Sequence, residues 1–218
     1  MKAAMDIPIL YQDDAIVVAV KPPGLLAVPG RGPDKEDCLV SRLRVLFPHM
    51  IAQPAVHRLD MATSGLMVFA ITATAHRELS RQFAGRTVAK EYIAVLDGLV
   101  AAKAGRIELA FRLDPTNRPR QIYDPERGKL GITRWRRLGD EQGLSQGRSR
   151  LALFPETGRT HQLRLHTAHP LGLGIPIVGD ILYGHGRDGN RLLLHATSLA
   201  FVHPVSGKRL VFRSEPDF

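Results

Sequence analysis

The sequence contains a single cysteine, Cys38, among its 218 residues. One cysteine can form neither an internal disulfide nor a cysteine-rich zinc site, and proteins that do without both are typical of a reducing cytoplasm. No apolar run approaches the ~20 residues that span a bilayer, and Asp6 interrupts the apolar start of the chain, so no targeting segment is recognised. We therefore expect a cytoplasmic protein that does not enter a membrane.

Several catalytic signatures are also missing. The sequence has no G-x-S-x-G of a serine hydrolase and no G-x-x-x-x-G-K-[ST] of a P-loop. It has nine histidines, but none form the i,i+4 pair of a zinc-binding helix. We expect no metal site, and no residue calls for an organic cofactor. Cys38 begins a leucine-rich segment with no evident activating base, which argues against a nucleophile.

Acidic residues are fewer than basic ones. Lys and Arg number 30 against 21 Asp and Glu, which leaves a formal charge of +9. Such an excess favours a polyanionic partner, and nucleic acid is the commonest of these. Charge alone leaves two alternatives open, since a basic surface also serves solubility or binding to an anionic membrane.

Short strands dominate what is present. Alternating or continuous apolar residues predict strands in ILYQ and AIVVAV around a turn at Asp13–Asp14, then in GLMVFA, KEYIAVL, RIELAFRL, GITRWRRL, RLALF, RLLLHATSLAFV and RLVF. The segment KPPGLLAVPGRGP is rich in proline and glycine and is expected to form a loop. GDEQGLSQGRS is expected to form a polar hairpin connection.

Helices are expected in three places. Leucines at helical spacing predict one in CLVSRLRVLF. TATAHRELSRQFAG predicts an amphipathic helix with Ala75, Leu79, Gln82 and Phe83 on one side and Gly85 as its stop. A third, in THQLRLHTAH, is expected to begin at an N-cap, Thr160. The pattern predicts an α+β fold with a largely antiparallel mixed sheet flanked by helices and loops, in one domain.

Three titratable side chains stand just before the apolar strand at residues 65 to 70: His57, Arg58 and Asp60. Such groups are costly to desolvate unless they pair or take part in chemistry. A loop aspartate is most often a turn or cap residue, but a charged residue on a rigid strand mount is also where functional groups lie. To stay ionised, Asp60 needs a cation, and the chain offers Arg58 nearby and Arg159 or Arg164 far away in sequence.

The motif that contains these residues, HRLDMATSGLMVFA, resembles the aspartate motif of the RluA family of pseudouridine synthases. KEYIAVLDG resembles the tyrosine motif of that family, GRTHQLRLH its arginine motif, and GDILYG with RLLLHA its C-terminal pair, while KPPGLLAVPG and NRPRQ fit its short subgroup. The resemblance covers nearly the whole chain in order. It implies one pseudouridine synthase catalytic domain over residues 1–218, without an N-terminal S4 domain.

The resemblance also implies roles for individual residues. Asp60 matches the catalytic aspartate, Tyr92 the aromatic that stacks on the target uracil and takes part in proton handling at C5, and Arg164 the arginine that pairs with the aspartate. Arg58 matches the arginine that enters the RNA helix where the target base has left. The RNA-binding residues that the resemblance implies are Arg58, His57, Lys21, Arg118 and Arg120.

These roles suit the chemistry. Isomerising uridine breaks an N-glycosidic bond and rejoins the base through C5, for which one carboxylate acts as nucleophile or as base. A base in a stem must first be flipped out, which requires a wedge and a stacking platform. Without the resemblance, Tyr92 would read equally well as a half-buried strand tyrosine, and Arg164 as a helix-surface arginine.

The implied substrates are stem-loops of 23S ribosomal RNA and the anticodon stem-loop of tRNA, bound by a monomer. The main alternative is a catalytically silent RNA-binding protein on the same scaffold, which predicts the loss of the carboxylate or the tyrosine. An enzyme for free nucleosides fits poorly with a charge of +9 and with arginine-rich segments such as RWRR.

Overall fold

The computed structural model describes residues 7–139, 147–187 and 189–218. It divides into two compact units: unit 1 holds the N-terminal part to Lys90 with Ala196–Asp217, and unit 2 holds Glu91–His195 with Phe218. The chain passes between the units within strand β4 (Ala89–Leu96) and within strand β9 (Leu194–Val202). The predicted extent of one domain, residues 1–218, stays a prediction.

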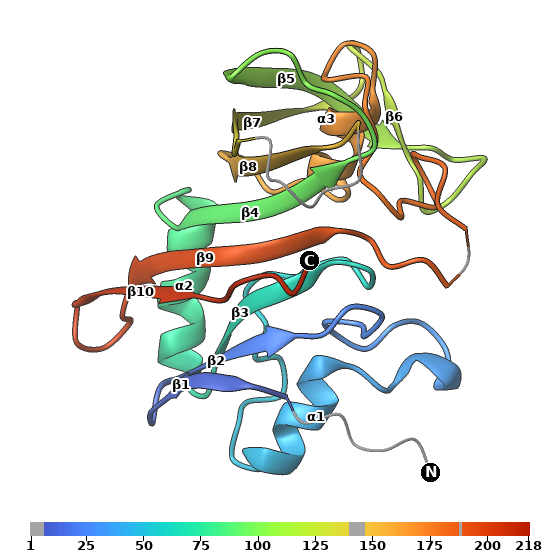
Figure 1. Cartoon of the computed structure of the whole chain (residues 1–218). Helices are drawn as coiled ribbons and strands as arrows, with labels where there is room; N and C mark the ends of the chain where they lie inside the picture. Colours follow the sequence, from blue (N-terminus) through green and yellow to red (C-terminus); the bar gives the residue numbers. More distant parts are fainter. Residues whose placement is uncertain (1–6, 140–146, 188) are drawn as a thin grey trace. The chain divides into compact units, whose positions relative to one another are not determined.

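Unit 1 is built on antiparallel strands (Figure 1). The order is β1 (Ile9–Gln12), β2 (Ile16–Lys21), β3 (Ser64–Ala70) and β9, and β10 (Arg209–Arg213) pairs with β9. Strand β1 pairs with β2, β2 with β3 and β10 with β9, all in antiparallel register. The strands expected in this part of the sequence are thus confirmed, including the turn after β1.

Two α-helices and a 3-10 turn complete unit 1: α1 (Leu39–Leu46), α2 (Ala73–Ala84) and η1 (Pro33–Lys35). Alternate residues of β2 and β3 form one core cluster with Ala75 and Leu79 of α2. Every second residue of a strand points to the same side of its sheet, and residues three or four apart lie on the same side of a helix. The alternate residues of β2 and β3 and the two helical residues therefore pack against one another. The predicted inward face of α2 and its end at Gly85 are confirmed.

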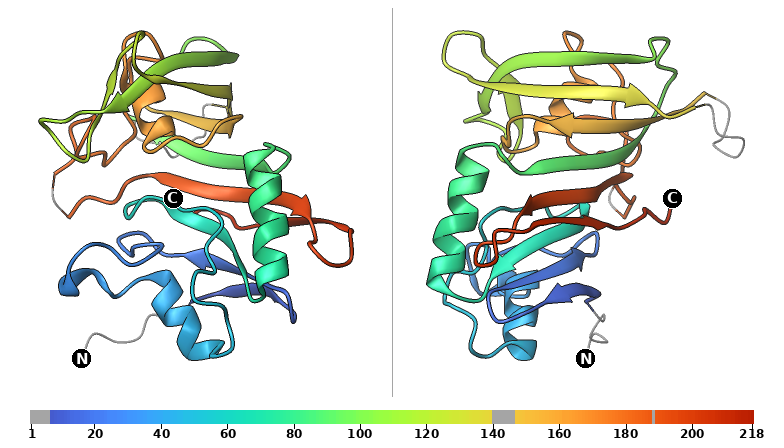
Figure 2. Two further views of the ribbon diagram at one scale, coloured as in Figure 1. Left: turned by 180° about the vertical axis from the view of Figure 1, so that it is seen from behind. Right: turned by 90° about the vertical axis from the view of Figure 1, so that its left-hand side faces the viewer.

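Unit 2 is a second antiparallel array with a short helix (Figure 2). Its strand order is β4, β8 (Ser149–Pro155), β7 (Lys129–Arg137), β5 (Ala104–Leu113) and β6 (Gln121–Tyr123). Helix α3 (Gln162–Ala168) contacts β5 and β7. Strands far outnumber helices among the described residues of both units. In unit 2, β8 pairs antiparallel with β4 and β7, and β5 pairs antiparallel with β6 and β7, so the predicted α+β class is confirmed.

The expected cap of α3 was wrong by one residue. The N-cap is His161, in a left-handed conformation with φ of 55° and without a side-chain cap bond, rather than Thr160. The side chain of Gln162 instead ties down the turn that precedes the helix: its Oε1 accepts hydrogen bonds from the Thr157 hydroxyl at 2.7 Å and from the Arg159 N–H at 3.1 Å. The turn before α3 is therefore closed from inside the helix.

Most of the polar connection GDEQGLSQGRS falls on residues 140–146, which lie outside the described residues. Within the ranges that the structure describes, no helix is both long and apolar enough to cross a membrane.

Candidate active site

Asp60 lies half-buried on a turn that leads into β3 in unit 1. The backbone closes this turn with a hydrogen bond of 3.1 Å from the Thr63 N–H to the Asp60 carbonyl. Gly65 follows at a φ of +114°, and a Cβ there would lie 2.4 Å from the carbonyl oxygen of Ala196 on β9. Only glycine tolerates both the backbone angle and the approach, so the sequence TSG fixes the path of the chain just after Asp60.

A buried lysine supports the same turn. Lys21 is 0% exposed, and its Nζ donates hydrogen bonds to the carbonyl oxygens of Met61 at 2.9 Å, Pro22 at 2.8 Å and Leu25 at 2.7 Å. Burial lowers the pKa of Lys21, and the negative charge of Asp60 opposes that shift. An ammonium has three donors, and all three go to carbonyl groups here. These contacts suit a structural role for Lys21, and its predicted contact with RNA stays a prediction.

His57 fastens the other end of the turn to β3. Its Nε2 accepts a hydrogen bond of 3.1 Å from the Val68 N–H, and its ring stacks on that of Phe83 at 4.5 Å. Burial, with the nearby charge of Lys90, lowers the pKa of His57 to about 3. The ring is thus neutral at physiological pH, with its proton on Nδ1 because Nε2 accepts. These contacts also suit a structural role, and the predicted RNA contact of His57 stays a prediction.

Arg58 differs from both of its neighbours in the motif. It is exposed, whereas Leu59 beside it is buried at 6% exposure. The motif thus presents one cation outward from a segment that is otherwise anchored, which is the arrangement that the predicted role of Arg58 requires.

Arg164 lies in unit 2 on α3 and is buried, at 4% exposure. It is therefore not the helix-surface arginine of the alternative interpretation. Its Nε and Nη2 donate to the two carboxylate oxygens of Asp180, each at 2.7 Å. A guanidinium offers five N–H groups in a planar fork, and this pair uses one edge of it. The predicted pairing of Arg164 with Asp60 stays a prediction.

Tyr92 is half-buried on β4, where it stands opposite Leu153 of β8. The other end of β4 is hydrogen-bonded to the segment that carries Asp180: the Val178 N–H donates to the Val95 carbonyl at 2.9 Å, and the Asp97 N–H donates to the Pro176 carbonyl at 2.9 Å. One strand of unit 2 thus carries Tyr92 and also anchors the approach to Asp180.

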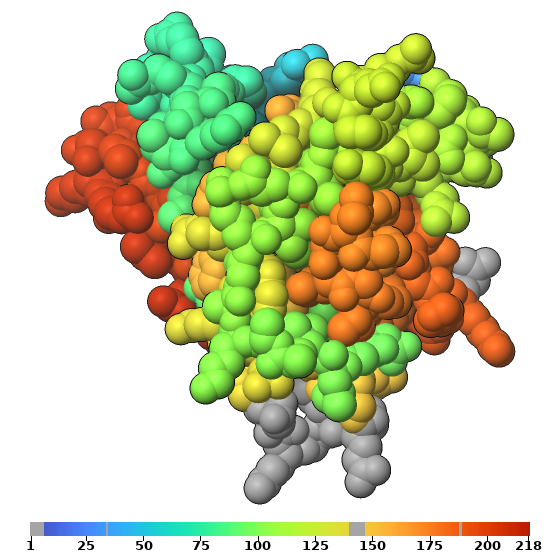
Figure 3. Space-filling model, turned by 90° about the horizontal axis from the view of Figure 1, so that it is seen from above, coloured from blue at the N-terminus to red at the C-terminus, as the bar shows by residue number. Residues whose placement is uncertain are grey.

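Arg118 and Arg120 are exposed on the excursion that joins β5 and β6. Figure 3 shows this excursion, in yellow-green, at the surface of unit 2. The carboxylate of Asp114 closes it, because Oδ1 accepts the Thr116 N–H at 2.9 Å and Oδ2 accepts from the Asn117 side chain at 3.0 Å. The two arginines therefore project from a hydrogen-bonded loop, as RNA-binding residues would.

Two residues of unit 2 were missed by the sequence reasoning. Asp180 holds Arg164, and Tyr183 places its ring within 5.4 Å of the Arg164 guanidinium and 5.6 Å of that of Arg120. Both belong to the segment GDILYG, which had carried part of the family resemblance. The motif was the signal that could have identified them, but no chemical role had been attached to it.

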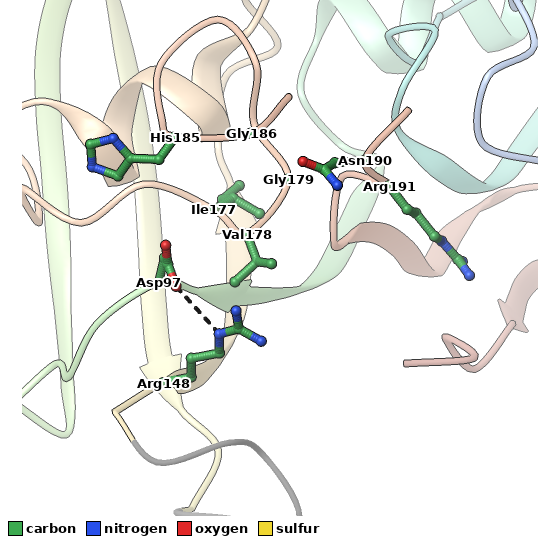
Figure 4. Close-up of a pocket in the computed structure, with 9 residues that line it drawn as sticks. All are labelled: Asp97, Arg148, Ile177, Val178, Gly179, His185, Gly186, Asn190 and Arg191. Atoms are coloured by element: carbon green, nitrogen blue, oxygen red, sulfur yellow. Dashed lines mark hydrogen bonds and ion pairs between the residues drawn. The ribbon is translucent and has the colours of Figure 1, made fainter. Parts of the chain in front are cut away.

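The structure also has a polar pocket of about 240 Å³ in unit 2 (Figure 4). It is lined by Asp97, Arg148, Ile177, Val178, Gly179, His185, Gly186, Asn190 and Arg191. Two of the lining residues, Arg148 and Asp97, form an ion pair of 3.3 Å at one side of it. None of the predicted catalytic or RNA-binding residues lines this pocket, so it lies outside the candidate site.

The candidate residues divide between the units. Unit 1 brings together Lys21, His57, Arg58 and Asp60 around one turn, and unit 2 carries Tyr92, Arg118, Arg120 and Arg164 on one framework of strands, loop and helix.

Comparison with known proteins gives a consistent result. The family model described as RNA pseudouridylate synthase matches residues 15–169. The chain is 43% identical over 213 residues to the dual-specificity RNA pseudouridine synthase RluA of Yersinia pestis, covering 96% of this chain and 99% of that protein. Its counterpart in Haemophilus influenzae is also 43% identical, with 96% and 93% covered. Human RNA Pseudouridylate Synthase Domain Containing 1 superposes with a TM-score of 0.79 at 29% identity, over 98% of this chain and 84% of that one.

Proposed function

The chain belongs to the RluA family of RNA pseudouridine synthases, and from this premise we propose that it isomerises specific uridines in stem-loops of 23S ribosomal RNA and in the anticodon arm of tRNA. Asp60 serves as the catalytic carboxylate. The observation that carries the proposal is the Asp60 turn, which Lys21, Thr63 and Gly65 fix in place within a chain that is 43% identical to an enzyme named for dual specificity.

The reaction rearranges a single nucleotide. The bond between N1 of uracil and C1′ of the ribose breaks, the base turns, C5 bonds to C1′, and C5 then loses its proton while N1 gains one. Asp60 acts as nucleophile or base in this sequence. Tyr92 stacks on the uracil and handles the C5 proton, and Arg164 keeps Asp60 ionised. The isomerisation has no net oxidation, and the proposal includes no cofactor.

RNA binding rests on charge and on exposed arginines. The formal charge of +9 attracts phosphates, which position an RNA without reading its sequence. Arg118 and Arg120 contact the RNA from their loop, and Arg58 fills the gap that the flipped base leaves in the stem. We propose that the protein does this as a monomer in the cytoplasm.

The deciding experiment maps pseudouridines in total RNA from cells with and without this protein. We expect pseudouridines to disappear from one stem-loop of 23S ribosomal RNA and from the tRNA anticodon arm. If pseudouridines disappeared from only one of the two RNA classes, the proposed dual specificity would be wrong. If no pseudouridine were lost while the purified protein still bound RNA, the protein would be the catalytically silent alternative. Sedimentation of the purified protein tests the monomer.

A further inference from the structure

Asp180 holds the predicted catalytic arginine from a turn of its own. Its two bonds to Arg164 are 2.7 Å long, and the two side chains are 0% and 5% exposed. Burial by itself raises the pKa of Asp180, but the hydrogen bonds and charge of Arg164 outweigh it and hold the pKa below the ordinary value. The carboxylate therefore stays ionised at neutral pH, and the pair is a charged, two-pronged one.

The turn that carries Asp180 is held by its own backbone. Asp180 Oδ1 accepts the N–H groups of Leu182 at 2.9 Å and Tyr183 at 3.0 Å, in addition to its bond with Arg164. The Asp180 carbonyl accepts the N–H groups of Gly184 and Gly186, both at 3.1 Å. A carboxylate tied at so many points has little freedom to rotate, so it fixes the guanidinium that it binds.

Tyr183 connects this turn with the arginine-bearing loop. Its hydroxyl oxygen accepts the N–H of Gln121 at 2.7 Å and lies 2.9 Å from Nδ1 of His161, the residue that precedes α3. Its ring lies within cation–π distance of Arg120 and of Arg164. One side chain thus contacts the loop that we propose binds RNA and the helix that carries the catalytic arginine.

We propose that Asp180 and Tyr183 are positioning residues for Arg164, and that Tyr183 makes the orientation of Arg164 depend on the loop from Arg118 to Gln121. This inference rests on the proposed function, in which Arg164 acts with Asp60. RNA that binds the loop would change the orientation of Arg164, because the Tyr183 hydroxyl bonds the loop while the Tyr183 ring faces the Arg164 guanidinium. Asp180 and Tyr183 should then affect the rate at which bound RNA reacts more than the affinity of the protein for RNA.

The test uses single-turnover rates at saturating stem-loop RNA, with the Kd of each variant measured separately. Tyr183→Phe keeps the ring and loses the hydroxyl, so we expect the rate to fall about tenfold, the size of one neutral hydrogen bond, while the Kd holds within about twofold. Asp180→Asn removes the charge from the pair, and we expect a loss of about a hundredfold. A Tyr183→Phe variant that changed only the Kd would overturn the proposal.

A double-mutant cycle shows whether the two residues act through Arg164. In an Arg164→Lys background, the Tyr183→Phe change should lower the single-turnover rate by less than about twofold, because the guanidinium that Tyr183 positions is gone. These slow reactions are followed for hours with enzyme in excess over RNA. Equal losses in both backgrounds would overturn the proposal. Tyr11→Phe is the matched control: it removes a hydroxyl bonded to Asp13 at 2.8 Å in unit 1, and it should leave the rate unchanged.

The outcomes separate this inference from the proposed function. A slow Arg164→Lys variant combined with a wild-type rate for Tyr183→Phe would overturn the positioning role alone. An Arg164→Lys variant as fast as wild type would overturn the catalytic role of Arg164 and the positioning role together. Asp180→Asn can fail to fold, since it leaves a buried guanidinium with a weaker partner, and in that case Tyr183→Phe decides.

Discussion

The Nζ of Lys21 lies 2.9 Å from the carbonyl oxygen of Met61, the residue directly after Asp60. A strand that ends at Lys21 thus holds the turn on which the proposed catalytic carboxylate stands. The lysine has no exposed surface, so the geometry of Asp60 depends on an interior side chain.

We predict that Lys21→Met destabilises the protein and slows it. Methionine matches the lysine stem but leaves one buried and two partly buried carbonyl groups without their donor, and a buried group left unpaired costs ~1–3 kcal/mol. We expect a loss of about 3 kcal/mol in the free energy of unfolding, measured by urea denaturation. Single-turnover rate should fall as well. Unchanged stability would show that the three hydrogen bonds contribute nothing.

Asp60→Asn should abolish turnover while RNA binding stays nearly intact. The change keeps size and hydrogen-bonding shape but removes the charge, and affinity rests on many phosphate contacts elsewhere. Formation of pseudouridine is followed by release of tritium from uridine labelled at C5, and binding by filter retention. Turnover by Asp60→Asn above a small fraction of the wild-type rate contradicts the catalytic assignment.

Two substitutions of Tyr92 should distinguish its stacking on the base from its part in proton transfer. Tyr92→Phe keeps the aromatic face, so we expect an unchanged Kd and a severe loss of single-turnover rate. Tyr92→Ala should in addition weaken binding by ~1–3 kcal/mol, the contribution of one stacked base. A normal rate for the phenylalanine variant would exclude the hydroxyl from proton transfer.

Arg58 should contribute more to the reaction rate on folded RNA than on unstructured RNA. Because it is the exposed cation of its motif, we expect Arg58→Ala to slow reaction on a folded stem-loop more than on a short unstructured strand, where no stacked base must be replaced. Arg164→Lys serves as the comparison, since it should slow both substrates alike by losing a two-pronged contact. Equal losses for Arg58→Ala on the two RNAs would leave Arg58 as a phosphate contact only.

His57 should make stability depend on pH in the acid range. Its native pKa of about 3 lies below the value of 6.5 for an unperturbed histidine. Between these values the unfolded chain binds more protons than the native protein, so the free energy of unfolding rises with pH, by at most ~1.4 kcal/mol per pH unit. Relative to His57→Gln, the wild type should lose stability as pH falls from 6.5 toward 4. Parallel curves for the two proteins would contradict the buried, neutral ring.

The elements that the sequence predicted well have local causes. The apolar run of β3 and the helical spacing of Ala75 and Leu79 in α2 can each be read within one segment, and the structure has both. The motifs around Asp60, Tyr92 and Arg164 could likewise be identified without coordinates, because each is a short continuous string.

What the sequence could not supply are partners distant along the chain. One of the three acceptors of Lys21 lies 40 residues away at Met61, and nothing in the segment KPPGLLAVPGRGP indicates that contact. The bond between Arg164 and Asp180 joins residues 16 positions apart, with the end of α3 and a stretch of irregular chain between them. Thr160 was expected to cap α3 from its residue type, but the helix begins one residue later, after His161 in a left-handed conformation. Each of these depends on tertiary contacts that outweigh local preference.

The loop with Arg118 and Arg120 has one more consequence. Hydrogen bonds to Asp114 and from the Arg120 N–H to the Asn117 carbonyl at 2.9 Å close it before any RNA arrives. The loop therefore loses its conformational entropy when the protein folds, and it has little more to lose when RNA binds. The association rate constant should then follow the salt concentration, as for diffusion toward a preformed charged surface, with no slow step set by folding of the loop.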